Sequence, residues 1–104
     1  MVMKSATFPN SVYEVMRQVT GETVAEAALP IVLKDLLRYK KEVLRAKITS
    51  FEKKYGMSLG EFEQACLDGR IEAPFSYEVE SDNWDWDSAV TELKDTEELE
   101  LWLE

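Results

Sequence analysis

The chain of 104 residues contains no histidine and a single cysteine, Cys66. A zinc site and the usual acyl-transfer triad both depend on those residue types, so the sequence supports neither of them. One cysteine cannot form an internal disulfide, and we expect Cys66 to be a small buried hydrophobe in a short helix. The four glycines occupy caps and turns and form no phosphate-binding loop. We therefore predict a protein that is not an enzyme and that binds no cofactor and no metal.

A calcium site is the one metal site that the sequence imitates. Asn83, Asp85 and Asp87 place oxygen ligands at alternate positions, as at the start of a calcium-binding loop. The rest of the pattern is missing, because Ser88 stands where the loop needs glycine and Lys94 stands where a bidentate glutamate closes the site. The sequence therefore argues against calcium.

Long apolar runs are also missing. No run approaches the roughly 20 residues that span a bilayer, and the N-terminus lacks the apolar core of a signal peptide. We expect a cytoplasmic protein that does not contact membranes.

Basic residues are scarce in the second half of the chain. Residues 56–104 carry 2 basic and 15 acidic side chains, whereas residues 31–55 carry 8 basic and 3 acidic ones, within a total net charge of −9. A strongly acidic region repels nucleic acid and attracts basic partners. Solubility alone is the alternative explanation of this acidity.

The segment from Ile31 to Tyr55 has helical spacing of apolar residues and contains neither glycine nor proline. At ~1.5 Å per residue this helix would span roughly 37 Å, which is longer than a globular monomer of this size encloses. We therefore predict a homodimer whose interface is one stripe of the helix, formed by Leu33, Leu37, Leu44, Ile48 and Phe51. Apolar residues on the neighbouring arc widen this face near its start, namely Val32, Leu36, Tyr39 and Val43.

A basic flank lies beside that stripe and consists of Lys34, Arg38, Lys41 and Arg45. Such a row could contact phosphates. The acidity of residues 56–104 favours two other interpretations, a solvated face or a face that pairs with the acidic C-terminal helix. We do not expect the isolated protein to bind nucleic acid.

Before this helix, the spacing of Ser11 and Glu14 predicts a capping box that opens a helix ending at Gly21, with a strand as the alternative. Thr23 and Glu26 repeat the capping-box spacing ahead of Pro30. Because proline disrupts a helix interior, we expect residues 24–29 to be a kinked first turn or a separate short helix. Residues 1–9 stay unassigned, as a frayed tail or an edge strand.

After the long helix, Gly56 predicts a tight helix-turn-helix corner, and Ser58 with Glu61 predicts a capping box for a helix from residue 59 to about 67. Alternating apolar residues predict an extended linker over residues 70–81, followed by an acidic helix from Asn83. Beyond Lys94 the apolar phase changes. Continuation of the helix would send Glu97 and Glu100 to the apolar face, so we expect a kink or a separate tail there.

Exposed aromatic and acidic residues of this C-terminal part are the candidate partner-binding site. We predict that residues 70–104 form a partner-binding arm within a single domain of residues 1–104. Trp86 fits core packing better than binding. The predicted contact residues are Trp84, Asp85, Asp87, Leu99, Trp102 and Leu103.

Two segments resemble phrases found in small uncharacterised acidic helical proteins of archaea and bacteria. The first runs from Phe51 to Ser58 and continues at residues 61–63, and the second runs from Tyr77 to Asp82 and continues at residues 86–90. The resemblance extends from about residue 33 to about residue 93. Those proteins are often encoded beside a small protein of the TumE-like toxin type, so the resemblance implies an antitoxin-like role. At positions 85 and 87 this chain has Asp where the pattern more often has Glu.

Together these observations predict an all-α fold with a long central helix, a corner at Gly56 and an acidic C-terminal helix after an extended linker. The predicted function is that of a non-enzymatic antitoxin-like protein whose acidic C-terminal half neutralises a basic partner, a toxin from the adjacent gene. The alternative is a homo-oligomeric helical structural or adaptor protein.

Overall fold

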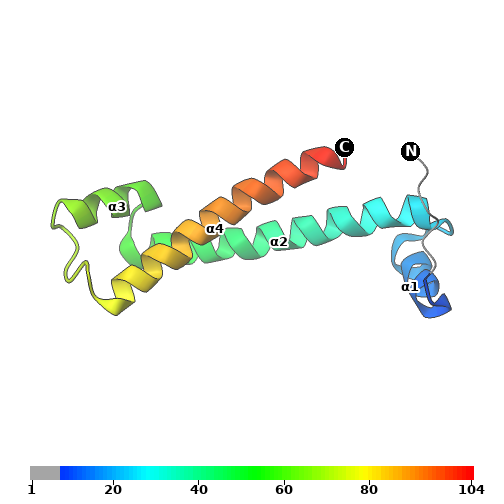
Figure 1. The fold of residues 1–104 in the computed structure, drawn as a ribbon, viewed down its shortest axis with the longest axis horizontal. Coiled ribbons are helices and arrows are strands. Elements are labelled where there is room, and N and C mark those ends of the chain that lie inside the picture. Colours follow the sequence, from blue (N-terminus) through cyan, green and yellow to red (C-terminus); the bar gives the residue numbers. More distant parts are fainter. Residues whose placement is uncertain (1–7) are drawn as a thin grey trace.

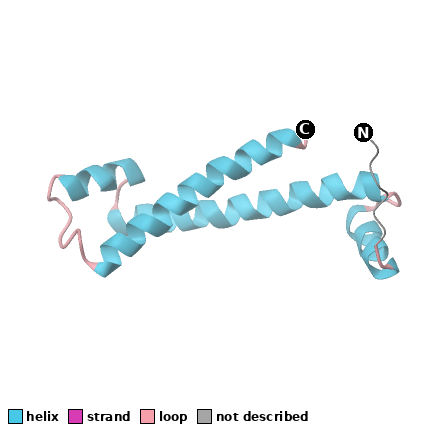
Figure 2. Ribbon diagram, in the orientation of Figure 1, coloured by secondary structure: helices cyan, strands magenta, loops and turns pink. Residues whose placement is uncertain are grey.

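The computed structural model describes residues 8–104, which form helices and, over that range, no strand (Figure 2). The elements are α1 (Asn10–Thr20), α2 (Ala25–Tyr55), α3 (Leu59–Leu67) and α4 (Tyr77–Trp102). The predicted all-α class is confirmed. The suggested edge strand at the N-terminus falls almost entirely on residues 1–7, which lie outside the described residues.

The molecule is elongated, with dimensions of 58 × 30 × 22 Å. Figure 1 shows α2 and α4 lying antiparallel along the longest dimension, and these two helices form the main contact of the fold. α1 packs on the N-terminal end of α2, and α3 lies at the opposite end beside the start of α4 (Figure 1). The core sits at the α3 end.

The predicted first helix is confirmed as α1, so the strand alternative is wrong. Two of the predicted capping boxes do not form. The box at Ser11–Glu14 does not form because α1 begins directly after Pro9, whose φ of −56° suits a helix start, and the Glu14 carboxylate pairs with Arg17. The box at Thr23–Glu26 does not form because the N-cap is Val24, which has no side-chain acceptor.

The long helix begins at Ala25 and continues through Pro30, so residues 25–29 are its first turn and the alternative of a separate short helix is wrong. The N–H groups of Ala27 and Ala28 both donate to the Val24 carbonyl at 3.0 Å, which closes the first turn ahead of the proline. Ala28 is 1% exposed at the end of α2 where α1 packs. Packing of α1 thus supports the helix where proline removes one hydrogen bond.

The corner at Gly56 is confirmed. Gly56 adopts a left-handed conformation with φ of 68°, and its N–H donates to the Glu52 carbonyl at 2.7 Å. The predicted capping box opens α3, since the Ser58 hydroxyl accepts from the Glu61 N–H at 3.3 Å and the Glu61 carboxylate accepts from the Ser58 N–H at 3.4 Å.

α4 begins earlier than the sequence predicts, so the extended linker is shorter. The Ser76 hydroxyl caps the helix by accepting from the Val79 N–H at 3.3 Å, and Glu78 and Glu80 in the first turn suit the helix dipole. Tyr77 and Val79 alternate as in a strand, but they belong to two faces of one helix: Tyr77 is exposed and Val79 is buried.

α4 continues without a break past Lys94 to Trp102, so the expected separate tail is wrong. Continuing the helix does bring Glu97 and Glu100 to the side of α2. There Glu100 pairs with Lys41 at 2.6 Å and Glu97 pairs with Arg45 at 3.7 Å. The acidic residues that interrupt the apolar phase therefore have cationic partners on α2.

An aromatic cluster forms the core between α2, α3 and α4. Trp86 is 0% exposed, as predicted for a core residue, and its ring lies 5.6 Å from Phe51, 6.0 Å from Tyr55 and 5.2 Å from Phe62. Its indole N–H is buried without an acceptor among the described residues. Segment 70–104 therefore contributes to the core, and its role as a partner-binding arm stays a prediction.

Candidate functional site

Ion pairs hold the inner face of α4 against α2. Besides the two pairs near the C-terminus, Lys54 binds Glu78 at 2.9 Å and Asp82 at 2.6 Å. The side chains of the Lys41–Glu100 pair are 16% and 28% exposed, so this pair is the best shielded of the four between the helices. Pairing with the acidic helix, one of the two favoured interpretations of the basic flank, is confirmed for Lys41 and Arg45.

A hydrogen-bonded group at the base of α4 changes the acidity of its members. Burial and a hydrogen bond donated to Asp82 raise the pKa of Tyr55 to about 12. Burial alone would raise the pKa of Asp82, but hydrogen bonds from Lys54 and Tyr55 outweigh it and lower that pKa. The hydrogen bonds that Lys54 donates to Asp82 and Glu78 raise the pKa of Lys54. Lys54 and Asp82 thus stay charged beside a neutral Tyr55, and their ion pair binds α2 to α4.

The opposite side of α4 presents a regular row of exposed residues, here called the outer face of α4. Successive members are three or four residues apart, so they share one side of the helix. The members are Tyr77, Glu80, Trp84, Asp87, Thr91, Asp95, Glu98 and Trp102, and all of them are exposed. Trp84 is 77% exposed and Trp102 is 82% exposed.

Geometry places the two tryptophans on the same line. They are 18 residues apart, which is five turns at 3.6 residues per turn and ~27 Å along the axis. Between them lie three carboxylates, those of Asp87, Asp95 and Glu98, none of which has an ion-pair partner among the described residues. The outer face thus combines unpaired negative charge with aromatic groups at both ends.

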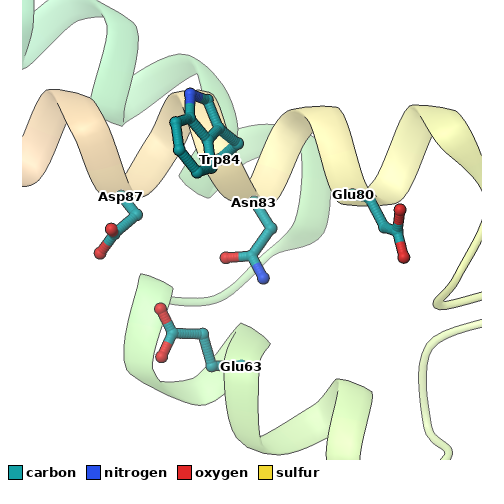
Figure 3. A pocket seen from close by; sticks show the side chains of 5 residues that line it. All are labelled: Glu63, Glu80, Asn83, Trp84 and Asp87. Carbon is teal, nitrogen blue, oxygen red and sulfur yellow. The ribbon is translucent and has the colours of Figure 1, made fainter.

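An acidic hollow of about 460 Å³ borders this face near its start. Figure 3 shows Glu80, Asn83 and Asp87 extending from α4 on the side of α3, from which Glu63 points back toward them. Trp84 completes the lining. Cationic side chains of a partner would find three carboxylates and an aromatic ring there.

An apolar groove of about 230 Å³ lies at the other end of α4, between it and the first half of α2. Its lining is entirely apolar and consists of Leu33, Leu36, Leu37, Leu99, Trp102 and Leu103. Trp102 is the last residue of α4 and belongs both to the outer face and to this groove. Contiguous exposed apolar surface of this kind marks interaction sites in soluble proteins.

The predicted partner-binding residues are therefore divided between two places. Trp84 and Asp87 line the acidic hollow, whereas Leu99, Trp102 and Leu103 line the apolar groove. Asp85 lines neither of them and is half-buried.

The predicted oligomer interface is divided as well. α4 of the same chain covers its second half: Leu44 is 8% exposed, and Ile48 and Phe51 pack on the core. These three are core residues, because the partner surface that their stripe requires is supplied intramolecularly. Leu33 and Leu37 instead line the apolar groove.

Sequence reasoning missed Glu63, Glu80 and Leu36 as site residues. Glu63 belongs to α3, and no local sequence pattern predicts that α3 packs beside α4. The regular row on α4 did have a signal, the spacing of 18 residues between Trp84 and Trp102. This spacing was not recognised as a signal, because the predicted linker and kink divided α4 into three parts.

The described residues contain no group of three or more His, Cys, Asp and Glu side chains arranged to hold a metal ion. No helix within residues 8–104 is long and apolar enough to cross a membrane. Burial raises the pKa of the Cys66 thiol, which disfavours the reactive thiolate.

Comparison with models of protein families finds no match, and comparisons with curated proteins and with solved structures find no similar chain. The resemblance to proteins encoded beside TumE-like toxins thus rests on the two sequence segments.

Proposed function

We propose that this chain is a cytoplasmic, non-enzymatic, antitoxin-like protein that binds a basic protein partner through the outer face of α4. The observation that carries the proposal is the row of exposed acids and aromatic residues on that face. α4 is attached to α2 by its other side, so the row is held rigid and open to solvent. The resemblance implies that the partner is a TumE-like toxin encoded by the adjacent gene.

In such a complex, the acidic charges would affect the rate of association and the aromatic contacts would affect its lifetime. α4 has ten acidic residues, of which four pair with α2 and six do not, namely Glu80, Asp85, Asp87, Glu92, Asp95 and Glu98. The unpaired charges would speed encounter with a basic surface. Burial of Trp84 and Trp102 would determine how long the complex lasts.

A charge-neutral variant tests the proposal. Replacing the four acids of the outer face (Glu80→Gln, Asp87→Asn, Asp95→Asn, Glu98→Gln) should weaken binding to the adjacent gene product and abolish most of its salt dependence. The matched control removes the same charge from exposed sites elsewhere (Glu22→Gln, Glu26→Gln, Glu52→Gln, Glu72→Gln) and should retain binding. Equal losses in both variants would mean that only net charge matters, and no loss in either would remove α4 from the mechanism.

A second candidate function is that of a self-associating helical adaptor or structural protein. Its support is the extended shape of the single chain. The radius of gyration is 20.1 Å, compared with about 13 Å for a compact domain of this length. The accessible surface is 8024 Å², compared with about 6000 Å² for a compact monomer of this mass. Sedimentation of the purified chain distinguishes a monomer from an assembly.

A further inference from the structure

A second apolar row runs along α2 beside the stripe that packs on α4, and is here called the outer stripe of α2. Its members are three and four residues apart in strict alternation, which is the spacing of the two apolar positions of a coiled-coil heptad. They are Leu29, Val32, Leu36, Tyr39, Val43 and Ala46. Leu36 is 57% exposed, Tyr39 64% and Val43 49%, so the middle of this stripe is open to solvent in the single chain. Val32 is half-buried, and Leu36 also lines the apolar groove.

The outer stripe is separate from the stripe that packs on α4. At 100° per residue, Leu36 and Val43 lie about a third of a turn from Leu37 and Leu44 around the helix axis. Leu44 is buried under α4. A partner helix on the outer stripe would therefore leave the α2–α4 contact intact and would approach the outer face of α4 only at Trp102, which lines the apolar groove together with Leu36.

Charged residues flank the outer stripe in a regular arrangement. Asp35 and Glu42 directly precede Leu36 and Val43, whereas Lys40 and Lys47 directly follow Tyr39 and Ala46. Glu42, Lys40 and Lys47 form no ion pair with any described residue, and Asp35 has only an exposed contact with Arg38 at 3.2 Å. One side of the stripe is therefore acidic and the other basic.

This arrangement distinguishes between helix orientations. In a parallel pair of identical helices, the residue before one apolar position faces the residue five positions later in the other helix. Asp35 of one copy would then face Lys40 of the other, and Glu42 would face Lys47. In an antiparallel pair, acids would face acids and lysines would face lysines, which is unfavourable.

We propose that the outer stripe of α2 binds a second copy of this chain, with the two α2 helices parallel. The flanking charges are complementary between two copies in this orientation, and the exposed side chains of Leu36, Tyr39 and Val43 lie between them. This inference specifies the surface and orientation for the second candidate function, self-association, on which it rests. It does not depend on the antitoxin-like proposal, because the outer face of α4 from Tyr77 to Glu98 lies outside the apolar groove that Leu36 shares with Trp102.

Analytical ultracentrifugation of the full chain tests the surface. The wild type should sediment as a dimer of twice 12.0 kDa, and the double variant Leu36→Asp, Val43→Asp should sediment as a monomer at about 100 μM. Both residues are exposed in the single chain, so helicity by circular dichroism should be unchanged. The control is Leu67→Asp on α3, an exposed leucine off the stripe, which should leave the dimer intact.

Disulfide trapping tests the orientation independently of that variant. In a Cys66→Ser background, Ala46→Cys alone should form a covalent dimer under mild oxidation, because identical positions meet in a parallel pair. A covalent dimer that forms only when Ala46→Cys is mixed with Leu29→Cys would indicate antiparallel helices and overturn the proposed orientation. A dimer that persists in the Leu36→Asp, Val43→Asp variant would overturn the proposed surface while leaving self-association standing. A monomeric wild type at about 100 μM would overturn both.

Discussion

The two ends of this molecule differ in how their apolar residues are used. At the α3 end, Trp86 and Phe62 are completely buried, and ion pairs from Lys54 fix α4 to α2. At the α1 end, Val15 is 60% exposed and Val19 69% exposed, and the apolar groove lies open between α2 and α4. The α3 end thus holds the fold together, whereas the α1 end carries apolar surface that a single chain does not cover.

This difference indicates how a protein with a small core can present long binding surfaces. One aromatic cluster fixes the relative position of α2 and α4, and the two helices then extend beyond it as rigid arms. Stability should therefore be sensitive to substitution at the α3 end and tolerant on the outer faces.

Two tryptophans only two residues apart give the sharpest contrast. Trp86→Ala should reduce the free energy of unfolding by about 3–5 kcal/mol, because it empties the centre of the core. Trp84→Ala should change it by less than about 0.5 kcal/mol, because that side chain is exposed. Trp86→Phe should cost less than Trp86→Ala, since it keeps a ring and removes the unpaired indole N–H. Urea denaturation measures all three, and equal losses at positions 84 and 86 would contradict the assigned helix face.

Leucines offer the same comparison with a smaller effect. Leu44→Ala should cost about 2–3 kcal/mol of unfolding free energy, because Leu44 is buried between α2 and α4. Leu67→Ala, at an 82% exposed position on α3, should cost less than about 0.5 kcal/mol. Thermal denaturation followed by circular dichroism provides the measurement. A tolerated Leu44→Ala would show that α4 does not cover this part of α2.

Ion pairs along the α2–α4 contact should differ according to their shielding. A double-mutant cycle with Lys41→Ala and Glu100→Ala should give a coupling of about 1 kcal/mol, because both side chains are mostly shielded from water. The same cycle on Arg45 and Glu97, which are about half exposed and 3.7 Å apart, should give no measurable coupling. The opposite ranking would place the C-terminal end of α4 differently on α2.

The smallest effect concerns pH. Tyr55 has a pKa of about 12 in the folded chain, above the ordinary value of about 10. A raised pKa means that the neutral phenol stabilises the fold fully below pH 10 and that this contribution disappears as pH rises through 12. An absorbance titration of the phenolate should show a late step near pH 12 that is missing in Tyr55→Phe. The same titration curve in both proteins would show that Tyr55 does not form the hydrogen bond to Asp82.

Much of the fold could be predicted from local sequence. Gly56, Ser58 and Glu61 determine the corner between α2 and α3 through their own backbone and side-chain hydrogen bonds, so no distant residue is needed. The bounds of α4 could not be predicted in that way. The alternation at Tyr77 and Val79 resembles the pattern of a strand. It is the packing of Val79 against α2 and α3 that makes this segment the start of a helix.

Distant partners explain the remaining differences. Glu97 and Glu100 interrupt the apolar phase of α4. Their ion-pair partners, Arg45 and Lys41, lie more than 50 residues earlier in the chain. Periodicity also showed that Leu44 needs a partner surface, but it could not distinguish a helix of the same chain from a second copy. The candidate site was therefore predicted as a set of residues on one helix, without its division between an acidic hollow and an apolar groove.

The central claim is that the outer face of α4 binds a protein partner, and calorimetric titration of the adjacent gene product tests it most directly. The double variant Trp84→Ala, Trp102→Ala should fold normally and lose on the order of 2 kcal/mol or more of binding free energy. The control Phe75→Ala removes an equally exposed aromatic residue from the preceding loop and should bind as the wild type does. Binding of the double variant with unchanged affinity would contradict the account.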